Sequence, residues 1–173
     1  MSERERQTIL EELVEAWQGQ ASETFDYYVE KMRDLAEASY EPAIALFVWC
    51  LDDPRWNWRY NGLCNLGFHY VFPSDGPIVA KIQDLLLTDP HSSVREAAAS
   101  ILGSRSRWPD EALIRALEAD ADEQVRFATF EALLRLARVP IAVVTREIEQ
   151  VQTGRIQPTL KEIERILAET GLA

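Results

Sequence analysis

Apolar residues recur every three to four positions along most of the chain, which is the spacing of one face of an α-helix. In residues 3–18 this face carries Ile9, Leu13, Ala16 and Trp17. The same pattern predicts further helices at about 22–38, 41–51, 56–71, 77–87, 92–104, 109–119, 122–137, 140–153 and 158–170. No segment shows the strict alternation that is typical of a strand. The pattern therefore predicts an all-α fold of about ten helices.

A spacing of six residues between an Asp and an Arg recurs three times. A Trp or Val precedes each Arg, and a Leu follows it by seven positions. The pairs are Asp53 with Arg59, Asp89 with Arg95, and Asp120 with Arg126. The arginines lie 36 and 31 residues apart, which is within the range of helical repeat proteins.

Prolines support the same division of the chain. Apolar helical runs follow Pro42, Pro77, Pro109 and Pro140, and proline suits the first position of a helix, where its missing N–H would be unpaired anyway. Each unit is interpreted as a helix started by proline, a turn with Asp, and a second helix with Arg. The Asp is expected to cap the second helix, and the Arg to reach the turn or a neighbouring repeat. Predicted helix ends fall at Gly103, Gly154 and Gly171.

Residues 89–103 resemble the short bacterial HEAT-like repeats, whose pattern is D-x-x-x-x-V-R-x-x-A-x-x-x-L-G. Residues 120–134 are similar, with Leu134 in place of the closing Gly, and residues 53–67 match more loosely, with Trp58 for Val and Gly62 for Ala. The resemblance implies an α-solenoid of stacked antiparallel helix pairs, in which the second helices commonly line a concave face that holds a partner. Such repeats serve as scaffolds, as lyase subunits and in DNA-lesion recognition.

The expected organisation is a single domain over residues 1–173. Residues 1–39 would form an N-terminal capping helix pair without the Asp/Arg signature, residues 40–138 three repeats, and residues 139–173 the C-terminal capping helices.

Composition narrows the classes of partner. The net charge is −11, which argues against nucleic acid and against an anionic membrane surface, because phosphate contacts need clustered Lys and Arg. Residues 1–40 alone hold ten acidic and four basic residues. This acidic segment is interpreted as a solvated helix face, or alternatively as a docking face for a cationic partner. There is no signal-peptide pattern and no apolar run of spanning length, so a cytoplasmic location is expected.

Candidate chemistry is sparse. Cys50 and Cys64 lie in apolar runs outside any CxxC motif and are expected to be reduced, buried thiols. His91 falls in a repeat turn and His69 late in an aromatic helix, without the spacing of metal ligands. We therefore expect no metal, no cofactor and no catalytic residues, and a chain that is not an enzyme.

The least regular repeat contains the first candidate for partner binding. The repeat alignment assigns Trp58 to the core but sets Trp56 and Tyr60 opposite polar residues of the other repeats. An exposed Trp and Tyr four positions apart, beside Asn57 and Asn61, are typical of an interface hot spot. The alternative is that both rings pack against the preceding helix pair. Phe68 would extend the patch.

A second candidate lies in the predicted loop 104–109. Arg105 and Arg107 beside Trp108 could hold a carboxylate, and the net negative charge of the chain favours an acidic peptide over a phosphate. The alternative is a solvated loop with Trp108 between repeats.

Taken together, these features favour a non-catalytic protein-interaction module that binds a protein or peptide, as a monomer or weak homodimer. One alternative is an acidic immunity or inhibitor protein that neutralises a basic toxin, since opposite charge speeds capture. Another is a subunit of a HEAT-like lyase, with Cys50, Cys64 or His69 lining a pocket. DNA-lesion recognition would need a basic groove, for which the chain has few Lys and Arg residues.

Overall fold

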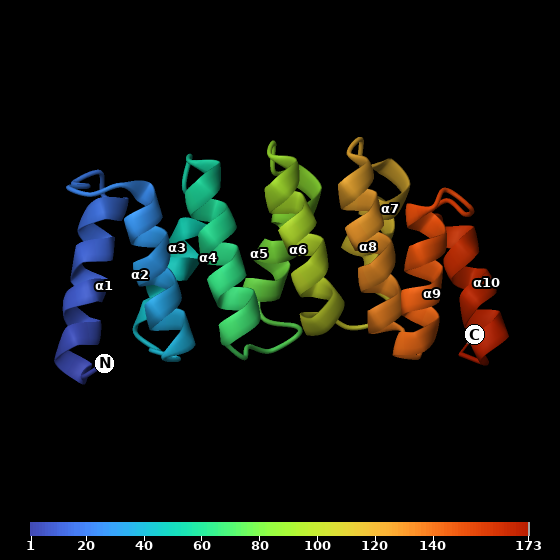
Figure 1. Ribbon diagram of the computed structural model, residues 1–173, viewed down its shortest axis with the longest axis horizontal. Coiled ribbons are helices and arrows are strands. Elements are labelled where there is room, and N and C mark those ends of the chain that lie inside the picture. Colours follow the sequence, from blue (N-terminus) through green and yellow to red (C-terminus); the bar gives the residue numbers. More distant parts are fainter. Residues whose placement is uncertain (173) are drawn as a thin grey trace. The chain divides into compact units, whose positions relative to one another are not determined.

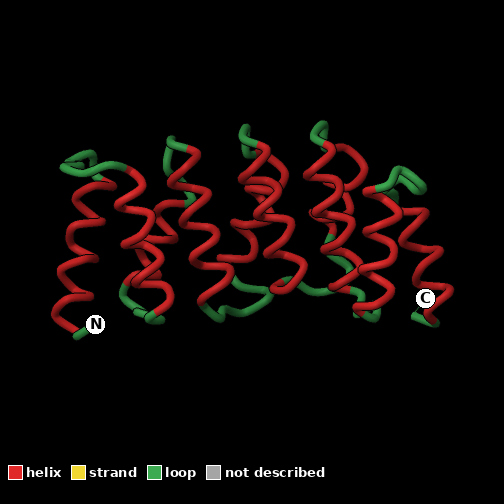
Figure 2. The backbone as a smooth tube through the Cα atoms, in the orientation of Figure 1, coloured by secondary structure: helices red, strands yellow, loops and turns green. Residues whose placement is uncertain are grey.

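The computed structural model describes residues 1–172, and Figure 2 shows helices joined by short loops. Within these residues there are ten α-helices and no strand. The helices are α1 Glu3–Trp17, α2 Phe25–Glu37, α3 Ala43–Cys50, α4 Trp56–His69, α5 Pro77–Thr88, α6 Ser92–Arg105, α7 Glu111–Ala119, α8 Glu123–Leu136, α9 Ile141–Gln152 and α10 Leu160–Thr170. The predicted all-α fold of about ten helices is confirmed.

The helices belong to two compact units, Met1–Val71 with α1 to α4 and a second unit from Phe72 onward with α5 to α10. In the second unit α6 packs against α8 and α5 against α7. Figure 1 shows α5 behind α6 and α7 behind α8. In the first unit α2 packs against α4 and α1 against α3. Each unit thus contains stacked helix pairs, whereas a single domain over residues 1–173 stays a prediction.

Each unit has its own apolar core. In the first unit Leu13, Met32 and Phe47 are fully buried, and in the second Ile82, Val94 and Phe130 are. Trp58 is 2 % exposed and its ring contacts Phe25, with 5.5 Å between ring centroids. Its predicted place in the core is confirmed.

Helix starts differ in detail from the prediction. Only Pro77 occupies the first helical turn, whereas Pro42 and Pro140 are the N-cap residues of α3 and α9. Pro109 lies before α7, whose N-cap is Asp110 with its carboxylate accepting from the Leu113 N–H at 3.0 Å. A carboxylate satisfies the free amides of a helix start, which proline cannot do, so the start at Pro109 was predicted two residues too early.

The predicted helix ends at glycine are confirmed at two of three sites. Gly154 follows α9 with a φ of +70°, and Gly171 caps α10 with a φ of +71°. Gly103 instead lies inside α6, where a Cβ atom would sit 2.7 Å from the Cα of Ala132. It permits the close approach of α6 and α8, and the prediction of a helix end there was wrong.

The predicted Asp/Arg pairs form a regular set of turn contacts. Each Asp side chain accepts from the backbone N–H two residues ahead, at 2.8 to 2.9 Å. That N–H belongs to the N-cap residue, so the Asp braces the turn rather than capping the helix. In α8 the cap is a second carboxylate, Asp122, which accepts from the N–H of Gln124 at 2.9 Å. The predicted capping by the repeat Asp is therefore corrected to an Asx-type turn.

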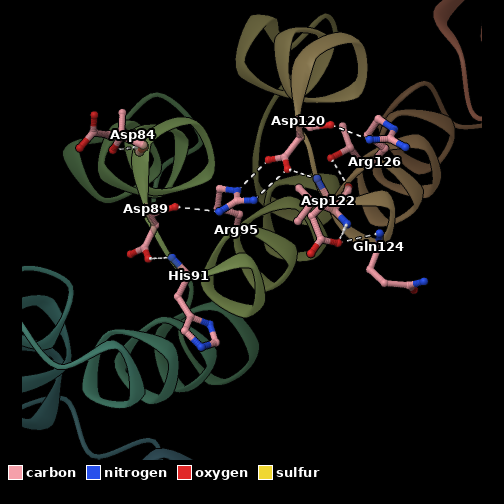
Figure 3. Close-up of polar contacts among 11 residues, drawn as sticks. Asp84, Asp89, His91, Arg95, Asp120, Asp122, Gln124 and Arg126 are labelled. Atoms are coloured by element: carbon pink, nitrogen blue, oxygen red, sulfur yellow. Dashed lines mark hydrogen bonds and ion pairs between the residues drawn. The ribbon is translucent and has the colours of Figure 1, made fainter.

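Each repeat Arg reaches back to its own turn, as Figure 3 shows for the second unit. Arg59, Arg95 and Arg126 donate from Nη1 to the backbone carbonyl of the Asp six residues earlier, at 2.8, 2.9 and 2.6 Å. Arg95 also donates to both carboxylate oxygens of Asp120 in the next repeat, at 2.7 and 2.9 Å. Both predicted roles of the Arg, toward its own turn and toward a neighbour, are confirmed at Arg95. We call this set of contacts the turn ladder.

No helix within residues 1–172 is both long enough and apolar enough to cross a lipid bilayer.

Candidate partner-binding surface

One side of α4 carries a stripe of three aromatic residues and a cysteine. Trp56, Tyr60, Cys64 and Phe68 follow each other at intervals of four residues, a spacing that places side chains along one side of a helix. Trp56 is 44 % exposed and Phe68 62 % exposed. The rings of Trp56 and Tyr60 meet edge to face, with 6.4 Å between centroids. Both side chains are thus exposed, as the first of the two alternatives requires, and the role of the pair in binding stays a prediction.

Asparagines run beside the stripe and are held by the helix itself. The side-chain amide of Asn61 donates to the carbonyl of Asn57 at 2.8 Å, and that of Asn65 donates to the carbonyl of Asn61 at 2.8 Å. Asn57 and Asn61 are half-buried. Because the side chain of Asn61 is already ordered by its bond to the helix, a partner that contacts it meets a smaller entropic cost of binding. We call Trp56, Asn57, Tyr60, Asn61, Cys64 and Phe68 the α4 surface.

The α4 surface has no charged side chain. The single Arg of α4, Arg59, is only 8 % exposed and points its guanidinium to the turn carbonyls of Asp53 and Pro54. Charged residues make up 27 % of the chain, so an uncharged exposed helix face stands out. Uncharged groups lose less hydration free energy than ionised groups when a partner covers them, and cores of protein interfaces are rich in Trp and Tyr and poor in charge.

An acidic face lies next to the α4 surface. α2 packs against α4 through Phe25 and Tyr28, whose rings lie 5.5 and 6.5 Å from that of Trp58. The exposed residues of α2 are mostly acidic, namely Asp26, Glu30, Asp34 and Glu37, with Arg33 among them. The repeat alignment did not find this neighbour because α2 lacks the Asp/Arg signature.

The two thiols differ in access. Cys50 is fully buried and Cys64 half-buried, and both are free, as predicted. Burial raises the pKa of Cys50 to about 12 and that of Cys64 to about 11, although a hydrogen bond with Tyr60 lowers the latter. Few thiolate ions therefore form near neutral pH, and the thiolate is the nucleophilic form.

Arg105 and Arg107 belong to the second unit and contact different groups. Arg105 lies in the last turn of α6, not in a loop as predicted, and its guanidinium carbon is 5.6 Å from the ring centroid of Phe72. Arg107 lies in the loop after α6, donates to the hydroxyl of Ser74 at 2.6 Å and pairs with Asp75 at 3.4 Å. It lines an open cavity of about 550 Å³ between α5 and α7. A grip by both arginines on one carboxylate stays a prediction.

Within residues 1–172, no three His, Cys, Asp or Glu side chains are grouped so that they could hold a metal ion. His91 is the N-cap residue of α6, the turn position predicted for it, and His69 ends α4.

Comparison with protein-family models, with curated proteins and with solved structures finds no match to this chain.

Proposed function

We propose that this chain is a non-catalytic protein-interaction module of HEAT-like repeats and that the α4 surface binds its protein or peptide partner. The observation that carries the proposal is an exposed, uncharged helix face that presents three aromatic side chains, Trp56, Tyr60 and Phe68, beside the ordered amide of Asn61. Trp and Tyr at the centre of an interface commonly supply most of its binding free energy. We further propose that the chain acts in the cytoplasm as a monomer or weak homodimer.

The test is a comparison of partner recovery by matched variants. The wild type and the double variant Trp56→Ala/Tyr60→Ala are used as baits in the source cell extract, and the bound proteins are identified by mass spectrometry. We expect a protein that the wild type recovers to be lost with the double variant. Both substituted side chains are exposed, so the helical content should be unchanged in circular dichroism.

The matched control is Ile141→Ala, which removes an exposed apolar side chain, 64 % accessible, from α9 in the second unit. Recovery of the same partner should be unaffected in this control. Equal recovery by the wild type and the double variant would refute the assignment of the α4 surface.

A second candidate is the immunity or inhibitor protein that captures a basic toxin. The acidic face of α2 beside the α4 surface favours it, because opposite charge raises the rate of encounter. The association rate with the recovered partner should then fall steeply between low and physiological salt, where the Debye length shrinks to about 8 Å. A rate that does not depend on salt would exclude this candidate but leave the α4 surface intact.

A further inference from the structure

The turn between α9 and α10 has the register of a ladder turn but lacks the Asp. The ladder Asp lies three residues before the first residue of α4, α6 and α8, at positions 53, 89 and 120. The same offset before α10, which begins at Leu160, falls on Gln157. Pro158 follows it, as Pro54 and Pro90 follow the ladder Asp in two of the three earlier turns. The turn ladder therefore ends with an amide in place of a carboxylate.

In the described part of the chain, Arg126 consequently has one guanidinium hydrogen bond where Arg95 has three. Both donate from Nη1 to the carbonyl of their own turn, at 2.6 Å for Arg126 and 2.9 Å for Arg95. Arg95 is then held by the two carboxylate oxygens of Asp120, as Figure 3 shows. Arg126 forms no ion pair with any carboxylate of residues 1–172, and its other guanidinium N–H groups donate to none of their acceptors.

An open cavity of about 560 Å³ lies beside Gln157, the residue that occupies the position of the ladder Asp in this turn. Arg126 and Gln157 both line it, together with Lys161, Thr159 and Glu118. Two basic groups against one acidic group make this place locally positive in a chain of net charge −11. The apolar part of the wall comes from Leu117, Pro158 and Leu160.

We propose that this cavity is a binding site for a carboxylate supplied from outside the chain, which Arg126 holds as Arg95 holds Asp120. The planar fork of an arginine matches the two oxygens of a carboxylate. A carboxylate suits the site better than a phosphate for two reasons. The carboxylate of Glu118 repels the second negative charge of a phosphate, and Arg126 is the one arginine among the described residues in the wall of the cavity. Its source is a small carboxylic acid or the carboxylate of a bound polypeptide. The proposal does not depend on the α4 surface, which belongs to the other unit.

The test follows the Nε–Hε resonance of Arg126 by nuclear magnetic resonance during titration. The probes are sodium acetate, acetyl-Leu-Asp with an amidated C-terminus, and acetyl-Leu-Asn with an amidated C-terminus. We expect saturable shifts with the first two probes and none with the Asn peptide, which lacks the carboxylate. Tighter binding of the Asp peptide than of acetate assigns the site to a polypeptide, and equal affinity assigns it to a small acid.

Two variants test the geometry. Gln157→Asp places a carboxylate in the ladder position, so it should abolish binding of both probes and raise the thermal midpoint. Gln157→Asn is the matched control without charge and should keep the binding. Arg126→Gln, which no longer has the reporting Nε–Hε group, is followed through the backbone amide resonances of Gln157 and Lys161 in the same cavity; it should lose the binding, and circular dichroism checks that the variant is folded. Undiminished probe binding by Gln157→Asp, or equal shifts with the Asn peptide, would overturn the proposal.

Discussion

The carboxylate of Asp120 joins two segments of the second unit. It accepts a hydrogen bond from the backbone N–H of Asp122 at 2.9 Å, which braces the turn before α8. It also accepts hydrogen bonds from Nε and Nη2 of Arg95 on α6. Its side chain is 7 % exposed and that of Arg95 is 15 % exposed. Hydrogen bonds between ionised groups are roughly twice as strong as neutral ones when they are shielded from water.

The first prediction concerns this pair. Burial raises the pKa of Asp120, but the hydrogen bonds from Arg95 and from Asp122 outweigh it and hold the pKa below the ordinary 3.8. Asp120→Asn should lower the free energy of unfolding by about 1–3 kcal/mol at neutral pH, because Asn keeps the shape but loses the ionic hydrogen bonds. Urea denaturation measures this loss.

The sign of its pH dependence follows from the lowered pKa. Stability from a carboxylate with a depressed pKa is present above its unfolded value and is lost as the pH falls through the folded value. The difference between wild type and variant should therefore shrink on acidification below about pH 4. The exposed carboxylate Asp84 gives the control, since Asp84→Asn should have little effect at either pH. A gap that stays constant down to acid pH would contradict the assigned ion pair.

The second prediction concerns the thiols. With pKa values of about 12 for Cys50 and about 11 for Cys64, both should react with iodoacetamide far more slowly at neutral pH than in the unfolded chain. Cys64 should react first, because it is half-buried whereas Cys50 is fully buried. Mass spectrometry of the labelled protein measures the order. Fast labelling of either native thiol would instead favour the lyase-subunit alternative.

Between helices, the contact of α6 with α8 depends on the absence of a side chain. A Cβ on Gly103 would meet the Cα and Cβ of Ala132 at 2.7 and 2.8 Å, and these atoms belong to a packed helix that cannot move freely. Gly62 has the same role in the first unit, where a Cβ would lie 2.8 Å from the carbonyl oxygen of Phe47. The loose match of residue 62 to the repeat pattern thus reflects close packing of α3 and α4.

The third prediction is therefore that Gly103→Ala destabilises the protein, although Ala is the better helix former. Overpacking should lower the free energy of unfolding by about 1–3 kcal/mol. The control is Ser100→Ala on the exposed side of the same helix, which should change it by no more than about 0.5 kcal/mol. Urea midpoints of the two variants measure the difference. A stabilised Gly103→Ala variant would mean that α6 and α8 are not in close contact there.

Across the whole molecule, the excess of negative charge opposes folding. The net charge is −11, and residues 1–40 hold ten acidic residues against four basic ones. Such self-repulsion destabilises a compact state. The largely buried Arg95–Asp120 pair is less sensitive to salt than exposed charges are.

The fourth prediction follows from this balance. Raising the NaCl concentration from low to physiological should increase the thermal midpoint, because screening weakens the repulsion of exposed acidic side chains more than the shielded ladder contacts. Differential scanning calorimetry measures the midpoint, with the chloride salt of another monovalent cation as the control for ion identity. A midpoint that falls with salt would show that exposed ion pairs dominate instead.

Much of the local structure was predictable from the residues alone. The apolar spacing located all ten helices to within a few residues, since the 3.6-residue period is a local property of the backbone. The repeat alignment placed Trp58 in the core, where it lies, and set Trp56 and Tyr60 opposite polar residues of the other repeats. It also offered each repeat Arg its own turn or a neighbouring repeat as partner, and the structure shows both at Arg95.

Other features depended on neighbours distant in the chain. The amino-acid sequence was enough to predict the helices and the Asp/Arg pairs, whereas the exposure of Trp56 and Tyr60 was decided by the fold. Only the tertiary structure showed that Gly103 faces Ala132, that acidic α2 flanks the α4 surface, and that Arg126 opens on a cavity beside Gln157. The physical reason is that periodicity reports which side of a helix is buried, whereas the groups that meet that side are decided by how separate helices pack.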